Sequence, residues 1–80
     1  MVALYRIITD MKQKKETCSN FGRKIRNYRI SLGISQEELA DRAQVHRTYI
    51  GGIERGERNP TLTTIYKIAD ALKIPPMDFF

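Results

Sequence analysis

The chain has 80 residues, a net charge of +5 and a hydrophobic content of 41%, which fits one small folded domain. A domain of this size has little interior for a substrate pocket, so a large enzyme is excluded. One cysteine and one histidine exclude an internal disulfide and a four-ligand zinc site, and we expect no metal or cofactor. The N-terminal apolar stretches are too short for a signal peptide or a membrane span, which favours a cytoplasmic protein without a membrane partner.

Residues 1–18 have the weakest local signals in the chain. The run at 4–9 is compatible with a short strand, a helix start or a flexible arm, and the lysines at 12–15 are typical of a solvated segment. We interpret 1–18 as a short N-terminal arm, followed by one domain at 19–80.

The first predicted helix spans about 20–32, and Gly33 follows it as a left-handed stop. Its apolar residues share one face at the spacing i, i+4, i+7 and i+11: Phe21, Ile25, Tyr28 and Leu32. The same segment carries four basic residues and no acid: Arg23, Lys24, Arg26 and Arg29. We interpret most of this block as a solvated helix face.

Ser35 and Glu38 form a capping box, which predicts a second helix at 36–43. Its inward positions are Leu39, Ala40 and Ala43. A third helix is predicted to begin near His46, a weak cap because it lacks the short side-chain oxygen of serine or aspartate. Gly56 closes this helix.

A fourth helix is predicted to open at Pro60 and Thr61, and its apolar positions share one face as far as Leu72. The prolines at 75 and 76 either end it or start one short final turn. The predicted fold class is therefore all-α.

Two short helices joined at 43–45 match the geometry of a helix-turn-helix, whose second helix lies in the DNA major groove. The segments 34–40, 49–56, 60–62 and 68–72 resemble the Xre/Cro-type helix-turn-helix family, and 47–59 most resembles the controller proteins of restriction-modification systems. This resemblance covers about residues 20–80. It implies a compact five-helix, lambda-repressor-like domain, here with a longer arm than controller proteins usually have and with Gln44 where many relatives have glycine.

Residues in the first turn of a helix inserted into the groove reach base edges. Arg47 is the best candidate, because arginine pairs bidentately with guanine O6 and N7, and Thr48 can hydrogen-bond to a base or contact a thymine methyl. Tyr49 completes the expected base-contacting set, although its ring could instead contact phosphate or pack at the domain edge.

Contacts to the DNA backbone are expected from five polar residues: Gln36, His46, Arg58, Asn59 and Thr64. Gln36 stands beside the unpaired N–H groups of a helix N-terminus, which attract phosphate. For Arg58 and Asn59 the contact is implied by the resemblance. Ordinary surface polarity is the alternative for each of the five.

Glu37 and Asp41 lie one turn apart on the outer face of the second helix. In activators that this family resembles, that surface contacts the RNA polymerase sigma factor. Stabilisation of the helix dipole by first-turn carboxylates is the alternative. Glu54 is expected to pair within the domain.

The C-terminus is apolar and has little remaining core to fill, which predicts a homodimer interface. Its expected members are Ile74, Met77, Phe79 and Phe80. The predicted function is a prokaryotic, nucleoid-associated transcriptional regulator that binds pseudo-palindromic double-stranded DNA. A phage-type repressor, or an antitoxin or adaptor that binds protein through the same fold, is the alternative, and the scattered polar residues do not suggest an enzyme.

Overall fold

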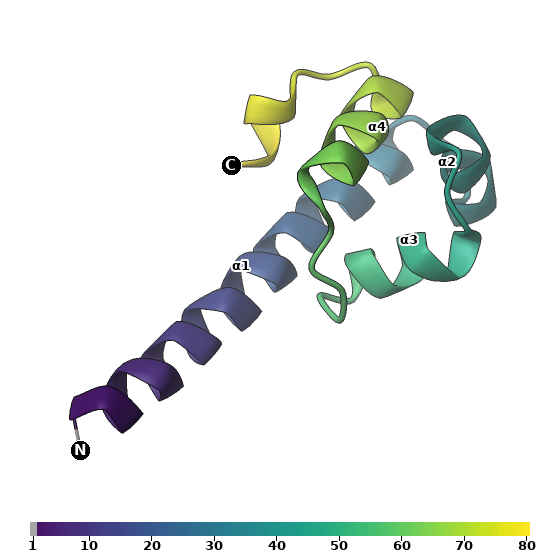
Figure 1. Ribbon diagram of the computed structural model, residues 1–80. Helices are drawn as coiled ribbons and strands as arrows, with labels where there is room; N and C mark the ends of the chain where they lie inside the picture. Colours follow the sequence, from purple (N-terminus) through teal and green to yellow (C-terminus); the bar gives the residue numbers. More distant parts are fainter. Residues whose placement is uncertain (1) are drawn as a thin grey trace.

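The computed structural model describes the backbone of residues 2–80 and the side chains of residues 14–80. The elements are α1 (Val2–Ser31), α2 (Gln36–Ala43), α3 (Arg47–Glu54), α4 (Leu62–Leu72) and the 3-10 helix η1 (Pro76–Phe79). Figure 1 shows α2, α3 and α4 gathered at the C-terminal half of α1. The all-α prediction is confirmed, but the expected five-helix domain has four α-helices, because the final element is a single 3-10 turn that is capped by Pro75 and begins at Pro76.

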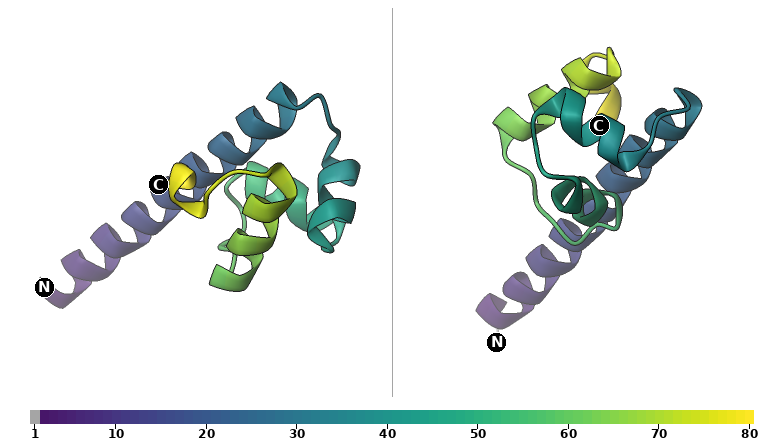
Figure 2. Two further views of the ribbon diagram at one scale, coloured as in Figure 1. Left: turned by 90° about the horizontal axis from the view of Figure 1, so that it is seen from above. Right: turned by 90° about the vertical axis from the view of Figure 1, so that its right-hand side faces the viewer.

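The first helix is much longer than predicted. It begins at Val2, so the predicted start near residue 20 is wrong, and residues 2–18 are neither a strand nor an irregular arm. No glycine or proline precedes Gly22, and good helix formers such as lysine, glutamine and glutamate fill residues 12–16. Figure 2 shows this half of α1 extending beyond the other helices, and the molecule measures 48 × 23 × 21 Å.

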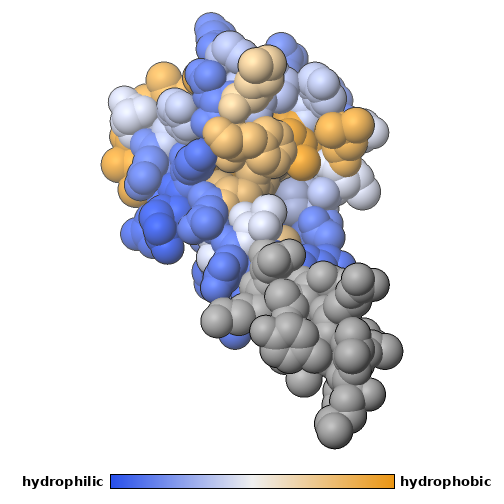
Figure 3. Space-filling model, turned by 90° about the vertical axis from the view of Figure 1, so that its left-hand side faces the viewer, coloured by the Kyte–Doolittle hydropathy of each residue, from blue (hydrophilic) through white to orange (hydrophobic). Residues whose placement is uncertain are grey.

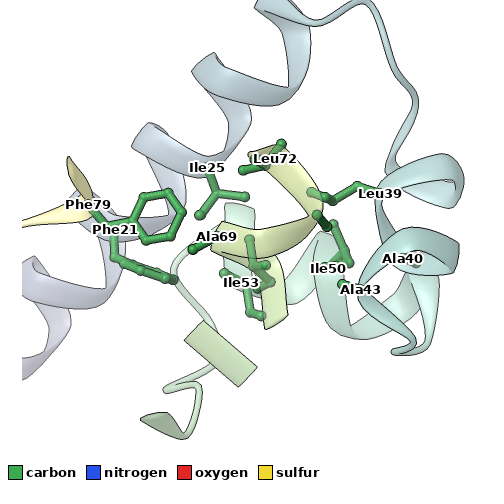
Figure 4. Close-up of a cluster of buried hydrophobic side chains, with 12 residues drawn as sticks. Phe21, Ile25, Leu39, Ala40, Ala43, Ile50, Ile53, Ala69, Leu72 and Phe79 are labelled. Carbon is green, nitrogen blue, oxygen red and sulfur yellow. The ribbon is translucent and has the colours of Figure 1, made fainter. Parts of the chain in front are cut away.

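The core lies where α1, α3 and α4 cross, with α2 closing one side (Figure 4). Its largest fully buried side chains are Ile25, Leu39, Ile50, Ile53, Ile68 and Leu72. The predicted inward face of the first helix holds for Phe21 and Ile25, which are buried, and for Tyr28, which packs against the core. Leu32 is half exposed, because α1 ends at Ser31 and the chain turns away.

Four of the described residues adopt left-handed backbone conformations where helices end: Gly33, Gln44, Gly56 and Lys73. Gly33 and Gly56 have φ angles of +70° and +75°, which confirms both predicted glycine stops. Gln44, at the turn between α2 and α3, has a φ of +58°, and its N–H donates to the carbonyls of Ala40 and Asp41. The turn between the two helices therefore has a left-handed residue at position 44, a conformation that glycine adopts at the lowest cost, although the residue here is glutamine.

Phe79 is part of the core, which corrects its predicted place on a dimer surface. The η1 turn folds the C-terminus back across α1, so the Phe79 ring lies edge-on to Phe21 at 5.2 Å and to Tyr28 at 6.1 Å. Phe80 also stacks on Phe21, at 6.0 Å, yet most of its surface remains exposed. The domain completes its own core with a residue that we expected a partner to cover.

Gly22 allows α1 to contact the end of α3. A Cβ atom at this position would overlap the carbonyl oxygen of Ile53 and lie 2.9 Å from that of Glu54. One turn earlier, Ser19 lies so close to Gly56 that a Cβ on the glycine would be 2.7 Å from the serine Oγ. Sequence periodicity contains no signal for either contact.

Replacing Gly22 by alanine should lower the free energy of unfolding by about 1–3 kcal/mol, because the methyl group forces two backbones apart. This loss should appear although alanine is intrinsically the better helix former by about 1 kcal/mol. Urea denaturation measures it. Asn20→Ala, at an exposed position of the same helix, is the control and should stay within about 0.5 kcal/mol of the parent. Equal stability of the two variants would contradict the close contact.

Candidate nucleic-acid interface

The N-terminus of α2 is capped as the capping box predicts, but only on one side. Ser35 Oγ accepts a hydrogen bond from the Glu38 backbone N–H at 3.0 Å. The Glu38 carboxylate is instead paired with Arg42, one turn along α2, at 3.1 Å. The predicted bounds of 36–43 are confirmed.

His46 caps α3, which corrects the expectation of a weak cap. Its ring Nδ1 accepts a hydrogen bond from the Thr48 N–H at 3.1 Å. Imidazole can replace the oxygen of serine here because an unprotonated ring nitrogen is an acceptor. Contact between His46 and the DNA backbone stays a prediction.

An open hollow separates the N-terminal ends of α2 and α3. Its lining includes three predicted DNA contacts: Gln36, Arg47 and Thr48. The Arg47 side chain is 68% exposed, and its guanidinium lies 3.7 Å from the carboxylate of Glu37, which lines the same hollow. Two helix N-termini and an exposed arginine make this hollow suited to an anionic ligand.

A buried network lies beneath the hollow and joins three helices. Arg29 of α1 donates from Nε and Nη2 to the two carboxylate oxygens of Glu54, at 2.7 and 3.0 Å, and from Nη1 to the Ile34 carbonyl at 2.9 Å. Gln36 of α2 donates to the same carboxylate at 3.1 Å. The side chains of Arg29 and Glu54 are only 12% and 2% exposed. The predicted pairing of Glu54 within the domain is confirmed.

Arg29 differs from the solvated face that we predicted for most of its block. Its hydrogen bonds with Glu54 raise the pKa of Arg29, which outweighs the opposing effect of burial. The guanidinium therefore stays charged wherever the protein is folded. Its partner lies 25 residues away in the chain, so no local pattern could identify it.

Gln36 has a fixed place in this arrangement. Its amide nitrogen donates to Glu54, and its oxygen lies on the side of Gly51, where a Cβ would be 3.5 Å away. A Cβ at Gly51 would also be 3.1 Å from the Arg55 guanidinium. Gly51 thus leaves room for two polar side chains at the hollow.

The remaining predicted residues lie along α3 and in the segment that follows it. Arg58 places its guanidinium 6.0 Å from the centre of the Tyr49 ring, and its stem covers Gly52, where a Cβ would be 2.7 Å from Arg58 Cγ. Tyr49 is half-buried and packs against the core, so the ring occupies the domain edge. Asn59 is exposed one residue further on.

Thr64 takes part in capping α4. Its N–H donates to Thr61 Oγ1 at 3.3 Å, and the two hydroxyl oxygens lie 3.0 Å apart. Thr61 is therefore the N-cap of α4.

Within residues 14–80 no cluster of three histidine, cysteine or acidic side chains could hold a metal ion. No helix in the part of the chain that the structure describes is long and apolar enough to cross a membrane.

Known proteins share both the sequence and this arrangement. Residues 25–79 match the family model described as helix-turn-helix. The control protein C.BamHI of Bacillus amyloliquefaciens is 51% identical over 59 residues, which covers 72% of this chain and 73% of the relative. The crystal structure of the restriction-modification controller protein C.AhdI from Aeromonas hydrophila has a TM-score of 0.78 at 44% identity, covering 79% of this chain and 96% of that one. The chain belongs to the helix-turn-helix family of controller proteins.

This family member is a helix-turn-helix transcriptional regulator homologous to restriction-modification controller proteins. The wild-type controller protein C.Esp1396I has the same fold, with a TM-score of 0.74 at 36% identity over 80% of this chain and 82% of that one. One further relative is described as an HTH-type transcriptional regulator and another as an immunity repressor protein.

In this regulator, Glu54→Gln should lower the free energy of unfolding by about 3 kcal/mol, because it leaves the buried Arg29 charge without a counter-ion. Glu38→Gln is the matched control, since it removes an exposed ion pair with Arg42 and should cost less than about 0.5 kcal/mol. Urea denaturation at neutral pH measures both. Similar losses in the two variants would contradict a central role for the Arg29 and Glu54 pair.

Proposed function

We propose that the regulator binds a pseudo-palindromic operator as a homodimer and controls transcription of its own gene and of the restriction gene. The observation that carries this proposal is the exposed pair Arg47 and Thr48 at the start of α3, beside the N-terminus of α2 and above the buried Arg29 and Glu54 pair. A rigid helix-turn-helix with solvated residues in its first recognition turn is the arrangement that reads base edges.

The magnitudes favour base reading by Arg47. Its ion pair with Glu37 is long, and both side chains are mostly exposed, so the pair contributes at most about 1 kcal/mol. A bidentate contact with guanine contributes about 1–3 kcal/mol of discrimination. Exchanging the Glu37 contact for a guanine contact therefore gives Arg47 a net gain in free energy. We propose phosphate contacts for Gln36, His46, Arg58, Asn59 and Thr64.

Selection from a random DNA pool should enrich a palindrome with the parent protein, because two copies present two recognition helices. Arg47→Ala should weaken binding by about 1–3 kcal/mol and relax the preference at one base position in each half-site. Arg42→Ala, which alters another exposed arginine of the helix-turn-helix, is the control and should keep the preference. An unchanged profile in Arg47→Ala would contradict base reading by Arg47, and a parent protein that enriches nothing would contradict sequence-specific binding.

The C-terminal surface is the proposed dimer interface. Met77 and Phe80 are exposed, while Ile74 packs partly against the core. Figure 3 faces the side on which the C-terminus lies and shows apolar side chains at the centre of that face. A two-fold axis through this surface would set two recognition helices about 34 Å apart, one turn of DNA.

Met77→Glu should convert the dimer to monomer, because Met77 is 81% exposed and the substitution would bury one carboxylate from each copy in the apolar isologous contact. Sedimentation velocity at micromolar concentration measures the change. Ile30→Glu adds the same charge at another exposed apolar position and should leave the dimer intact. A parent protein that sediments as a monomer, alone and on DNA, would overturn the dimer.

Contact between the sigma factor and Glu37 with Asp41 stays a proposal. Asp41 is exposed on the outer side of α2. Glu37 is held near Arg47, so DNA binding by Arg47 would release the carboxylate to a protein partner.

A further inference from the structure

The α1 extension is the part of α1 that precedes the predicted domain, residues 2–18. Two of its lysines lie beside the segment that follows the recognition helix. Lys14 and Lys15 line a hollow whose other wall includes Arg58 and Asn59. Both lysine side chains are exposed. The extension therefore brings positive charge to residues that the proposed function already places at the DNA backbone.

Helical periodicity explains why the lysines face this segment. Lys15, Ser19 and Gly22 are spaced by four and three residues, so they lie on one stripe of α1. Ser19 is packed against Gly56, and Gly22 is packed against the end of α3. The stripe that α1 uses to contact α3 thus continues, one turn before Ser19, as Lys15.

The charge around the hollow is positive. Lys14, Lys15 and Arg58 contribute three cations, and Glu57 is the one acidic residue in the lining. The Glu57 carboxylate is paired with Arg55 at 3.1 Å, so its charge is balanced from outside the hollow. A polyanion that passes Arg58 would meet two further ammonium groups on a rigid helix.

We propose that Lys14, Lys15 and Arg58 form a second phosphate-binding surface, which holds the duplex DNA backbone next to the recognition helix. This inference rests on the proposed function and extends it, because it assigns a role to the α1 extension. Ammonium groups on flexible stems bind phosphate without regard to base sequence. The surface therefore strengthens binding to every sequence and leaves the base preference to α3.

The test is the salt dependence of binding to the selected palindrome, measured by fluorescence anisotropy for the full-length parent and for K14Q/K15Q. Each lost phosphate contact reduces the slope of log K against log salt concentration by about 0.9. The slope should become shallower by about 1.8 per protomer, while the selected base profile stays the same. K24Q/K67Q removes two charges elsewhere on α1 and α4 and should keep the parent slope. Circular dichroism confirms that all variants fold.

A K14Q/K15Q slope equal to that of K24Q/K67Q would overturn the second phosphate surface, even when the parent protein enriches a palindrome normally. A changed base profile in K14Q/K15Q would also overturn it, since the lysines would then contribute to sequence reading. Failure of the parent protein to enrich any sequence would instead reject the proposed function.

Discussion

The ion pair between Arg29 and Glu54 is the contact on which the helix-turn-helix depends. It joins the first helix to the recognition helix, and Gln36 ties the second helix to the same carboxylate. Burying two charges is costly unless their hydrogen bonds are satisfied. Arg29 meets this condition through Glu54 and the Ile34 carbonyl, and Glu54 accepts from Arg29 and Gln36. The network fixes the orientation of α3 in a domain whose core is small.

Close backbone contacts complement this network at the same, C-terminal end of α3. Gly22 brings α1 against the carbonyls of Ile53 and Glu54, and Gly56 brings the following turn against Ser19. Glycine costs stability within a helix, but here its missing side chain lets two backbones approach. The recognition helix is thereby held at its C-terminal end, while Arg47 and Thr48 stay solvated at its start. Rigid support with exposed side chains suits base reading, because a rigid helix loses little conformational entropy on binding.

Local signals in the sequence predicted α2, α3 and α4 well. The Ser35 cap, the Gly33 and Gly56 stops and the spacing of apolar residues each act within a few positions of the chain. Tertiary contacts were not predictable in this way: Arg29 finds its partner 25 residues away, and Phe79 returns to Phe21 across most of the chain. The start of α1 was predicted wrongly because residues 2–18 contain no glycine or proline that would break the helix. The lack of a helix breaker is weaker evidence for a helix than a capping residue or a glycine stop is for a helix end. The hollow brings together Gln36, Arg47 and Thr48, three of the residues that the sequence predicts to contact DNA.

The positions of the ion pairs separate stability from recognition in this regulator. The Arg29 and Glu54 pair is buried and bidentate, so removing either residue would leave the charge of the other buried and unpaired. The Arg47 and Glu37 pair is long and exposed, so Arg47 can leave Glu37 for another partner at little cost in free energy. Two arginines with the same chemistry therefore have opposite uses, and burial decides which one is available to DNA. On the same argument, the exposed lysines of α1 can add phosphate contacts without disturbing the network that orients α3.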